Sequence, residues 1–122
     1  VAISSLLGFY PHVKAGRLKP LVVARKTRFP GTPDVPSSVE AGFPELDSNA
    51  WFGLFAPAKT PKHLILRVNK EVANALNTPQ IRDTLLSQGA EVAPTTPEAF
   101  GDYVKAEVVK WTRVVKESGY RQ

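Results

Sequence analysis

The side chains that could perform chemistry in this chain of 122 residues are few and scattered. His12 and His63 are its two histidines, and neither has a partner at the spacing typical of metal ligands. No serine lies in a Gly-x-Ser-x-Gly elbow, and no glycine-rich loop matches a phosphate cradle. The chain has no cysteine, which excludes disulfides, thiolate zinc sites and a cysteine nucleophile. We therefore expect no catalytic residues, no metal site and no cofactor.

Three carboxylates, Glu40, Glu45 and Asp47, lie close together in a segment rich in proline and glycine. A pair of carboxylates can act as general acid and base when both face one substrate. Surface loops routinely carry acidic residues, because such residues are well solvated there. The sequence therefore favours a solvated loop over a catalytic centre.

A block of basic residues precedes the first acid of the chain, Asp34. It consists of Lys14, Arg17, Lys19, Arg25, Lys26 and Arg28. With a net charge of +5, the block is typical of a surface that attracts phosphate, anionic lipid or small carboxylates, and a basic nucleic-acid-binding module is one alternative. No aromatic residue is interleaved with the block and no recognition-helix pattern appears, so a solvated basic face is favoured.

The elements that must position these residues begin with a strand, helix and strand unit. Val1–Ser4 predicts the end of a strand, and Ser4 or Ser5 can cap the helix that follows. Pro11 either kinks that helix or restarts it, and Gly16 ends it. Leu21–Ala24 predicts a second short strand. This length is typical of a right-handed parallel crossover.

A proline-rich segment then leads to a short apolar run. Its prolines and glycines exclude a continuous helix or a central strand between Phe29 and Pro44. Ala50–Ala56 is apolar almost throughout and predicts a strand buried on both faces. The segment therefore reads as an extended crossover between two packed units.

Three Thr-Pro pairs predict the starts of three helices in the second half of the chain: Thr60-Pro61, Thr78-Pro79 and Thr96-Pro97. Gly89 and Gly119 predict the ends of the second and third of these helices, and Glu91–Ala93 a brief edge strand. Apolar residues recur at helical spacing in all three, including Trp111, which we expect in the core rather than in a ligand platform.

The overall length suits a single domain, which at this size buries about two thirds of its unfolded surface. No apolar run approaches the roughly 20 residues that span a bilayer. The chain starts at Val1 and contains no methionine, so we interpret it as a processed, truncated or partially cloned piece of a longer protein.

Five stretches of the chain fall in an order and at a spacing that resemble a known family. They are HVKAGRLKPLVVARKTR, PDVPSSVEAGFPE, WFGLFAPAKTP, RVNKEVANAL and TPEAFGDYVKAE. The chain resembles the C-terminal part of the Bug proteins, the periplasmic substrate-binding components of tripartite tricarboxylate transporters. Ser37 stands where threonine is usual in that family.

The resemblance implies an α/β fold, part of a type II periplasmic-binding-protein arrangement, βα-rich with three C-terminal helices. Residues 1–26 would be the end of the second lobe, 27–49 the extended crossover, and 50–122 the C-terminal part of the first lobe. A β-strand at Trp51 that links the front of the chain to the rear helices is the structural test of this interpretation.

The resemblance also implies a function. The chain would belong to a non-enzymatic periplasmic protein that captures a small organic acid and passes it to membrane transporter subunits. Ser4 and Ser5 would lie at the strand end facing the ligand, whereas Trp51 and Gly53 would be structural. No nucleic-acid partner is implied. As it stands, the chain would expose strand edges and apolar helix faces, so we also expect it to self-associate.

Overall fold

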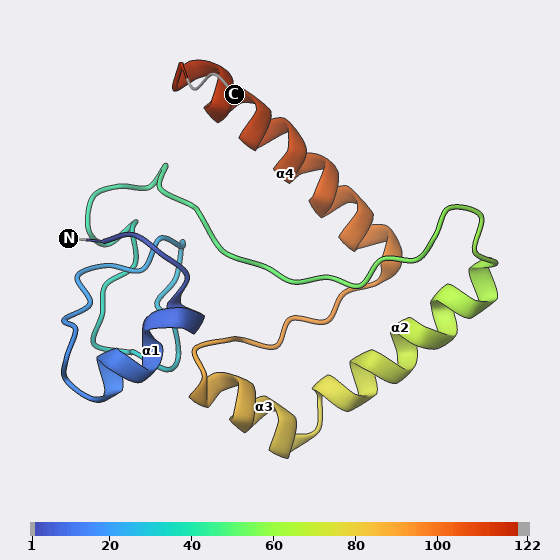
Figure 1. The fold of residues 1–122 in the computed structure, drawn as a ribbon, viewed down its shortest axis with the longest axis horizontal. Helices are drawn as coiled ribbons and strands as arrows, with labels where there is room; N and C mark the ends of the chain where they lie inside the picture. The colour runs from blue at the N-terminus through green and yellow to red at the C-terminus, as the bar shows by residue number, and fades with distance from the viewer. Residues whose placement is uncertain (1, 120–122) are drawn as a thin grey trace. The chain divides into compact units, whose positions relative to one another are not determined.

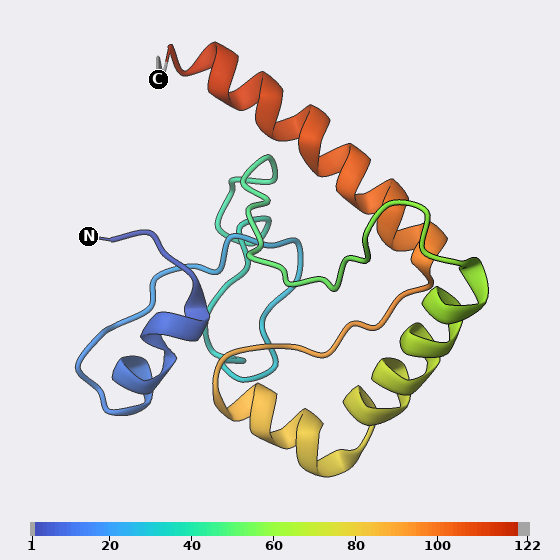
Figure 2. The ribbon, with the colours of Figure 1, turned by 45° about the vertical axis from the view of Figure 1, so that its right-hand side comes forward.

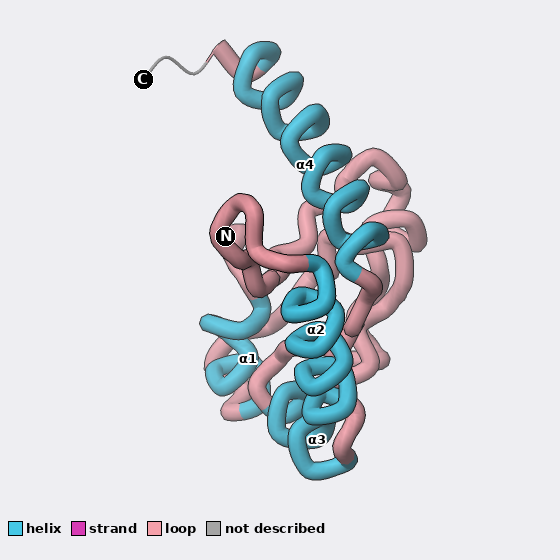
Figure 3. The backbone as a smooth tube through the Cα atoms, turned by 90° about the vertical axis from the view of Figure 1, so that its right-hand side faces the viewer, coloured by secondary structure: helices cyan, strands magenta, loops and turns pink. Residues whose placement is uncertain are grey.

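The computed structural model describes residues 2–119, which form four α-helices, with long loops at two of the three connections between them (Figures 1 and 3). The helices are α1 (Leu6–Lys14), α2 (Lys62–Leu76), α3 (Pro79–Ser87) and α4 (Pro97–Glu117). All four predicted helices are therefore confirmed. None of the helices in the described part of the chain is long and apolar enough to cross a membrane.

The chain divides into two compact units. Unit 1 contains residues 2–55 and 76–92, hence α1 and α3, and unit 2 contains residues 56–75 and 93–119, hence most of α2 and all of α4. The lobe boundaries at residues 26 and 49 stay predictions, because these contact units describe this chain alone.

The predicted strands are wrong for this structure. Leu21–Ala24, Ala50–Ala56 and Glu91–Ala93 form no strand, and the described part of Val1–Ser4 forms none either, Val1 lying outside the described residues. Across residues 2–119 the one β-bridge pairs Val23 with Ser37 in parallel. A strand needs a continuous ladder of backbone N–H and C=O partners, and within residues 2–119 these segments form a single bridge, at Val23, rather than a ladder.

The strand expected at Trp51 is thus absent, and Trp51 is 37% exposed. The structural test set by the sequence is not met, so this segment gives the two-lobe interpretation no support.

The core of unit 1 forms where α1 meets the proline-rich segment. Tyr10 of α1 is 4% exposed and Phe29 is 3% exposed, and their rings pack edge to face with centroids 5.9 Å apart. The Tyr10 hydroxyl donates a hydrogen bond of 2.8 Å to the Gly31 carbonyl. Gly31 must stay small, because a Cβ there would lie 2.4 Å from Phe29 Cε1 and 2.7 Å from the Tyr10 hydroxyl. Figure 2 shows α1 beside the turns of this segment.

The end of α3 also packs on α1. Gly89 has φ of +88°, a left-handed conformation that ends the helix as predicted. A Cβ on Gly89 would lie 2.9 Å from Tyr10 Cβ and 3.2 Å from the Leu6 carbonyl oxygen. Gly16 and Gly119, the other predicted helix ends, likewise have positive φ, of +68° and +69°. The absence of a side chain at Gly89 is what lets α3 approach the first turns of α1.

The three Thr-Pro pairs differ in how they start their helices. The Thr96 hydroxyl accepts a hydrogen bond of 3.2 Å from the Ala99 N–H and caps α4. Thr78 occupies the cap position of α3, but its side chain makes no capping hydrogen bond. The Thr60 hydroxyl donates a hydrogen bond of 2.8 Å to the Pro57 carbonyl. The predicted side-chain cap is therefore confirmed for α4 alone among these three helices.

Unit 2 buries little of its apolar surface. Its one buried residue among those described is Glu107, whose carboxylate accepts a hydrogen bond of 3.0 Å from the Trp111 indole and pairs with Lys110. Trp111 itself is exposed, so its predicted place in the core is wrong. The physical reason is that a helical apolar stripe is buried only where another element covers it.

Candidate ligand-binding site

The two serines expected to contact a ligand lie at the start of α1. Ser5 is the N-cap residue with φ of −59° and ψ of 134°, and its side chain makes no capping hydrogen bond. Its carbonyl accepts a hydrogen bond of 3.2 Å from the Gly8 N–H. Ser4 is exposed and Ser5 half-buried, and neither hydroxyl has a partner among residues 2–119.

The backbone of this helix end favours an anion. The first N–H groups of a helix lack an acceptor within it and carry a partial positive charge. Here the Gly8 N–H bonds to the Ser5 carbonyl, and those of Leu6 and Leu7 have no acceptor among residues 2–119. The first turn of α1 contains no acidic residue that would compete for those groups. Two unengaged hydroxyls and these N–H groups together form a set of hydrogen-bond donors suited to a carboxylate.

Unit 1 fixes the position of this helix end from two sides. Tyr10 is held by Phe29 and the Gly31 carbonyl, and Gly89 sits against Tyr10 and near the Leu6 carbonyl. Leu6 directly follows Ser5 in the chain. A shift of Gly89 that moves Leu6 would therefore also move Ser5.

The proline-rich segment that holds Tyr10 is itself stabilised by a capping box. The Ser37 N–H donates a hydrogen bond of 2.8 Å to Glu40 Oε2, and the Glu40 N–H donates one of 3.3 Å to Ser37 Oγ. This reciprocal pair closes a helical turn, with the Ala41 N–H bonded to the Ser37 carbonyl at 3.0 Å. Ser37 is buried, and a threonine at this place would offer the same hydroxyl.

Arg28 joins the capping box from the preceding loop. Its Nε donates a hydrogen bond of 2.9 Å to Glu40 Oε1, and its Nη1 donates one of 2.7 Å to the Pro33 carbonyl. The Arg28 hydrogen bond and then the Ser37 N–H lower the pKa of Glu40 to about 2. The same ion pair raises the pKa of Arg28. Glu40 is therefore an ionised structural acceptor and a poor general base.

Half of the basic block is engaged inside unit 1. Arg28 pairs with Glu40, Arg25 pairs with Glu91 at 2.8 Å, and Lys14 Nζ lies 5.2 Å from the centroid of the Tyr10 ring. The remaining members, Arg17, Lys19 and Lys26, are exposed. The block is thus split between structural pairs and a small solvated face.

The other candidates for chemistry stay apart. His12 on α1 and His63 on α2 are exposed helix residues. Within residues 2–119 no three or more histidine or acidic side chains gather as a metal site would require.

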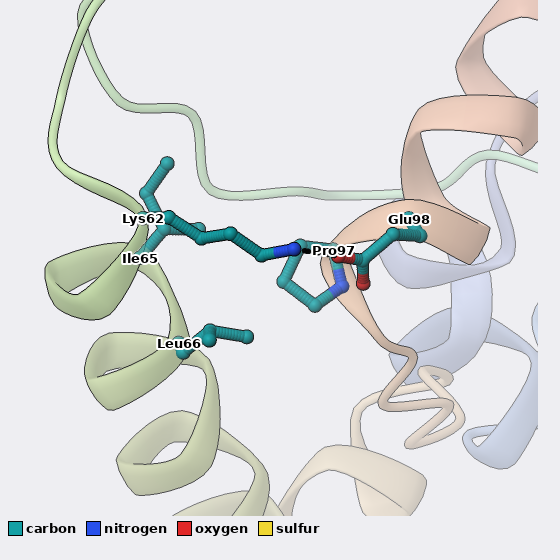
Figure 4. Close-up of a pocket in the computed structure, with 5 residues that line it drawn as sticks. All are labelled: Lys62, Ile65, Leu66, Pro97 and Glu98. Carbon is teal, nitrogen blue, oxygen red and sulfur yellow. Dashed lines mark ion pairs between the residues drawn. The ribbon is translucent and has the colours of Figure 1, made fainter.

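A cavity of about 300 Å³ lies between the start of α2 and the start of α4 in unit 2 (Figure 4). Ile65, Leu66 and Pro97 form its apolar wall, and Lys62 pairs with Glu98 across it at 3.3 Å. A hydrogen bond from the Glu98 backbone N–H and then Lys62 lower the pKa of Glu98. A carboxylate ligand would have to displace Glu98 from Lys62, so this cavity is a poor carboxylate site.

A second cavity of about 320 Å³ lies in unit 1 beside the C-terminal half of α1. Lys14 and Asp34 both line it, so its charges give no net preference for an anion. Thr32 also lines it, and the Thr32 hydroxyl oxygen is buried with no hydrogen-bond partner in the described chain. The start of α1 is therefore the better candidate for a carboxylate.

Two structural features were missed at the sequence level. The capping box was visible as Ser37-x-x-Glu40, the usual signature of a helical turn. The contact of Tyr10 with Phe29 and Gly31 had no sequence signal, because it joins residues far apart in the chain.

Known proteins resemble this chain over nearly its whole length. The model of the tripartite tricarboxylate transporter family receptor matches residues 1–120. Protein BugT of Bordetella pertussis is 28% identical over 96% of this chain and 36% of its own length.

Solved structures of periplasmic binding proteins are also similar to this chain. The backbone matches that of R. palustris Rpa4515 with adipate at a TM-score of 0.80 and 32% identity, over 93% of this chain and 38% of that one. It matches the periplasmic binding protein BugD at a TM-score of 0.77 and 29% identity, over 91% of this chain and 38% of that one. The chain thus spans well under half the length of these relatives, and over that span it has the backbone of a periplasmic binding protein. Because the family match covers residues 1–120, the chain belongs to the tripartite tricarboxylate transporter receptor family.

Proposed function

We propose that this chain is part of a periplasmic receptor that captures a small dicarboxylate and passes it to the membrane subunits of a tripartite tricarboxylate transporter. Family membership supports the receptor role, and the relative with adipate supports a carboxylate ligand. The likeness to BugD supports the periplasm. The receptor binds and releases its ligand without chemical change.

Within this proposal, one ligand carboxylate binds at the start of α1. The Ser4 and Ser5 hydroxyls and the first N–H groups of the helix donate hydrogen bonds to it. The observation that carries the assignment is that both hydroxyls lack partners, within the described chain, at a helix end free of acidic residues. The ligand's second carboxylate binds to parts of the receptor beyond these residues.

The proposed architecture is a type II periplasmic-binding protein with two α/β lobes. Residues 1–26 belong to one lobe, 27–49 cross between lobes, and 50–122 return to the other. The contact of the proline-rich segment with α1 supports a role for that segment in holding the ligand-binding helix end in place.

Isothermal titration calorimetry tests the proposal on a receptor that carries these residues, either the parent polypeptide or a chimera in which they replace the matching third of the adipate-bound relative. Titration with adipate and a panel of di- and tricarboxylates is expected to reveal binding to at least one. Ser4→Ala and Ser5→Ala are each expected to weaken it about tenfold or more, because a hydrogen bond to a charged group contributes about 1.5–3 kcal/mol.

Ser87→Ala is the matched control, since the Ser87 hydroxyl donates to the Thr84 carbonyl at 2.7 Å and is exposed at the end of α3. A folded receptor that binds none of the acids contradicts the function. A receptor that binds an acid equally well in all three variants contradicts the site alone.

A further inference from the structure

Arg28 closes a loop of the proline-rich segment, residues 28–40, at its base. Its Nε donates to both carboxylate oxygens of Glu40, at 2.9 and 3.0 Å, and Glu40 lies twelve residues further along the chain. Its Nη1 donates a hydrogen bond of 2.7 Å to the Pro33 carbonyl. An isolated surface ion pair contributes little to stability, but this guanidinium also binds the backbone. One side chain thus joins the beginning, the middle and the end of the 28–40 loop.

The 28–40 loop carries the residues on which Tyr10 rests. Phe29 packs edge to face on the Tyr10 ring, and the Gly31 carbonyl accepts a hydrogen bond of 2.8 Å from the Tyr10 hydroxyl. Two backbone hydrogen bonds of 3.0 Å shape this part of the loop, from Thr32 to the Phe29 carbonyl and from Val35 to the Thr32 carbonyl. The position of Tyr10 therefore depends on the shape of the loop.

Tyr10 is close enough to the start of α1 to carry a movement there. It lies five residues after the N-cap Ser5. Backbone hydrogen bonds between residues four apart make one or two helical turns move together, and the Gly8 N–H also bonds to the Ser5 carbonyl at 3.2 Å. A displacement of Tyr10 is thus a displacement of the helix end that begins at Ser5.

An arginine in a carboxylate receptor has two possible roles, direct contact with the ligand and support of the residues that make it. In this structure the Arg28 guanidinium is already engaged by the Glu40 carboxylate and the Pro33 carbonyl. A ligand carboxylate would have to displace Glu40 before it could bind there. The contacts of Arg28 therefore favour the supporting role.

We propose that Arg28 is a positioning residue for the ligand site: it fixes the loop on which Tyr10 rests, and through Tyr10 it places Ser4 and Ser5 at the ligand carboxylate. This inference rests on the proposed function, because Ser4 and Ser5 are the ligand contacts of that proposal. It assigns a role to a member of the basic block that the proposed function leaves without one.

Glu40→Gln separates positioning from direct contact, because the two roles predict opposite signs. Glutamine can still accept from the Ser37 N–H in the capping box, so the change chiefly removes the ion pair with Arg28. Calorimetry on the receptor described above, with adipate and the same panel of acids, is expected to show binding weakened about threefold or more. If Arg28 bound the acid directly, loss of its competitor would tighten binding. Tighter or unchanged binding in Glu40→Gln overturns the proposal.

A double variant tests whether Arg28 acts through Tyr10. Arg28→Gln and Tyr10→Phe are each expected to weaken binding about threefold or more. Because both changes disturb the same contact, the double variant is expected to bind within about twofold of the weaker single variant. Effects that multiply would show that Arg28 acts independently of Tyr10, and would overturn the proposal.

Arg113→Gln is the matched control, since Arg113 forms an exposed ion pair with Glu117 on α4 at 3.9 Å. It is expected to leave the affinity unchanged. Equal weakening in this variant would mean that loss of any exposed arginine pair lowers the affinity, and would overturn the proposal.

Amide hydrogen exchange without ligand gives a second measurement that does not depend on binding. Arg28→Gln and Tyr10→Phe are both expected to raise exchange in α1 and to leave α4 unchanged, which also checks that the variants stay folded. Unchanged exchange in α1 overturns the proposal. A receptor that binds none of the acids contradicts the proposed function, and the exchange of α1 then decides the positioning role by itself.

Discussion

Gly89 gives the sharpest test of how the start of α1 is held in place. Its φ of +88° is a left-handed conformation, and a Cβ would lie 2.9 Å from Tyr10 Cβ, closer than real side chains approach. Gly89→Ala therefore carries two separate costs. The left-handed backbone costs an alanine about 1–2 kcal/mol, and the forced displacement of a packed neighbour about 1–3 kcal/mol.

Two other glycines separate these costs. Gly16 has φ of +68° and Gly42 has φ of +85°, and no atom lies within 4 Å of a Cβ built on either. Gly16→Ala and Gly42→Ala are therefore expected to lower the free energy of unfolding by the backbone cost alone, about 1–2 kcal/mol. Gly89→Ala is expected to lower it by about 2–5 kcal/mol, the sum of both costs.

Urea unfolding followed by far-UV circular dichroism measures the three differences. The measurements belong at a protein concentration below that of self-association, because a dimer would add its own stability. If Gly89→Ala costs no more than Gly16→Ala and Gly42→Ala, then α3 does not press on α1 and the account of how Ser4 and Ser5 are positioned fails.

Two further predictions concern Glu40 and the threonine caps. The pKa of Glu40 is lowered to about 2 in the folded state, so its contribution to stability is complete above the unfolded value near 4.3 and is lost as pH falls toward 2. Thermal unfolding between about pH 7 and pH 2 is expected to show this loss in the native chain and a smaller loss in Glu40→Gln; identical pH profiles would refute the pairing with Arg28. Thr96→Ala is expected to cost about 1 kcal/mol in urea unfolding because the Thr96 hydroxyl caps α4, whereas Thr78→Ala, which removes no capping bond, is expected to cost less than half as much. Equal losses in these two variants would contradict the capping geometry.

The helices were predictable because their signals are local. Proline at the start, glycine at the end and apolar residues at helical spacing act within a few residues, and they placed α1 to α4 correctly. The threonine caps were less predictable, since the same Thr-Pro pair caps α4 with its hydroxyl and leaves α3 uncapped. A hydroxyl near a helix start has other acceptors within reach, as Thr60 shows: it lies two residues before α2 and donates to the Pro57 carbonyl.

The strands were not predictable from composition. Leu21–Ala24 and Ala50–Ala56 have the residues of buried strands, yet only Val23 finds a bridge partner in the described chain. An apolar β-branched run indicates that a strand would be stable beside a neighbouring strand. It does not determine whether the folded chain places a neighbour there.

The candidate site likewise has one part that the sequence determined and one part that only the tertiary structure decided. The sequence pointed to Ser4 and Ser5 only through a family resemblance, and it determined that a helix begins directly after them. The tertiary structure decided that their hydroxyls have no partner within the described chain and that Tyr10, Phe29, Gly31 and Gly89 hold the helix behind them. Caps and periodicity act along the chain, and so the sequence determines them. Contacts between residues far apart in sequence depend on how the whole chain packs, and only the folded structure specifies them.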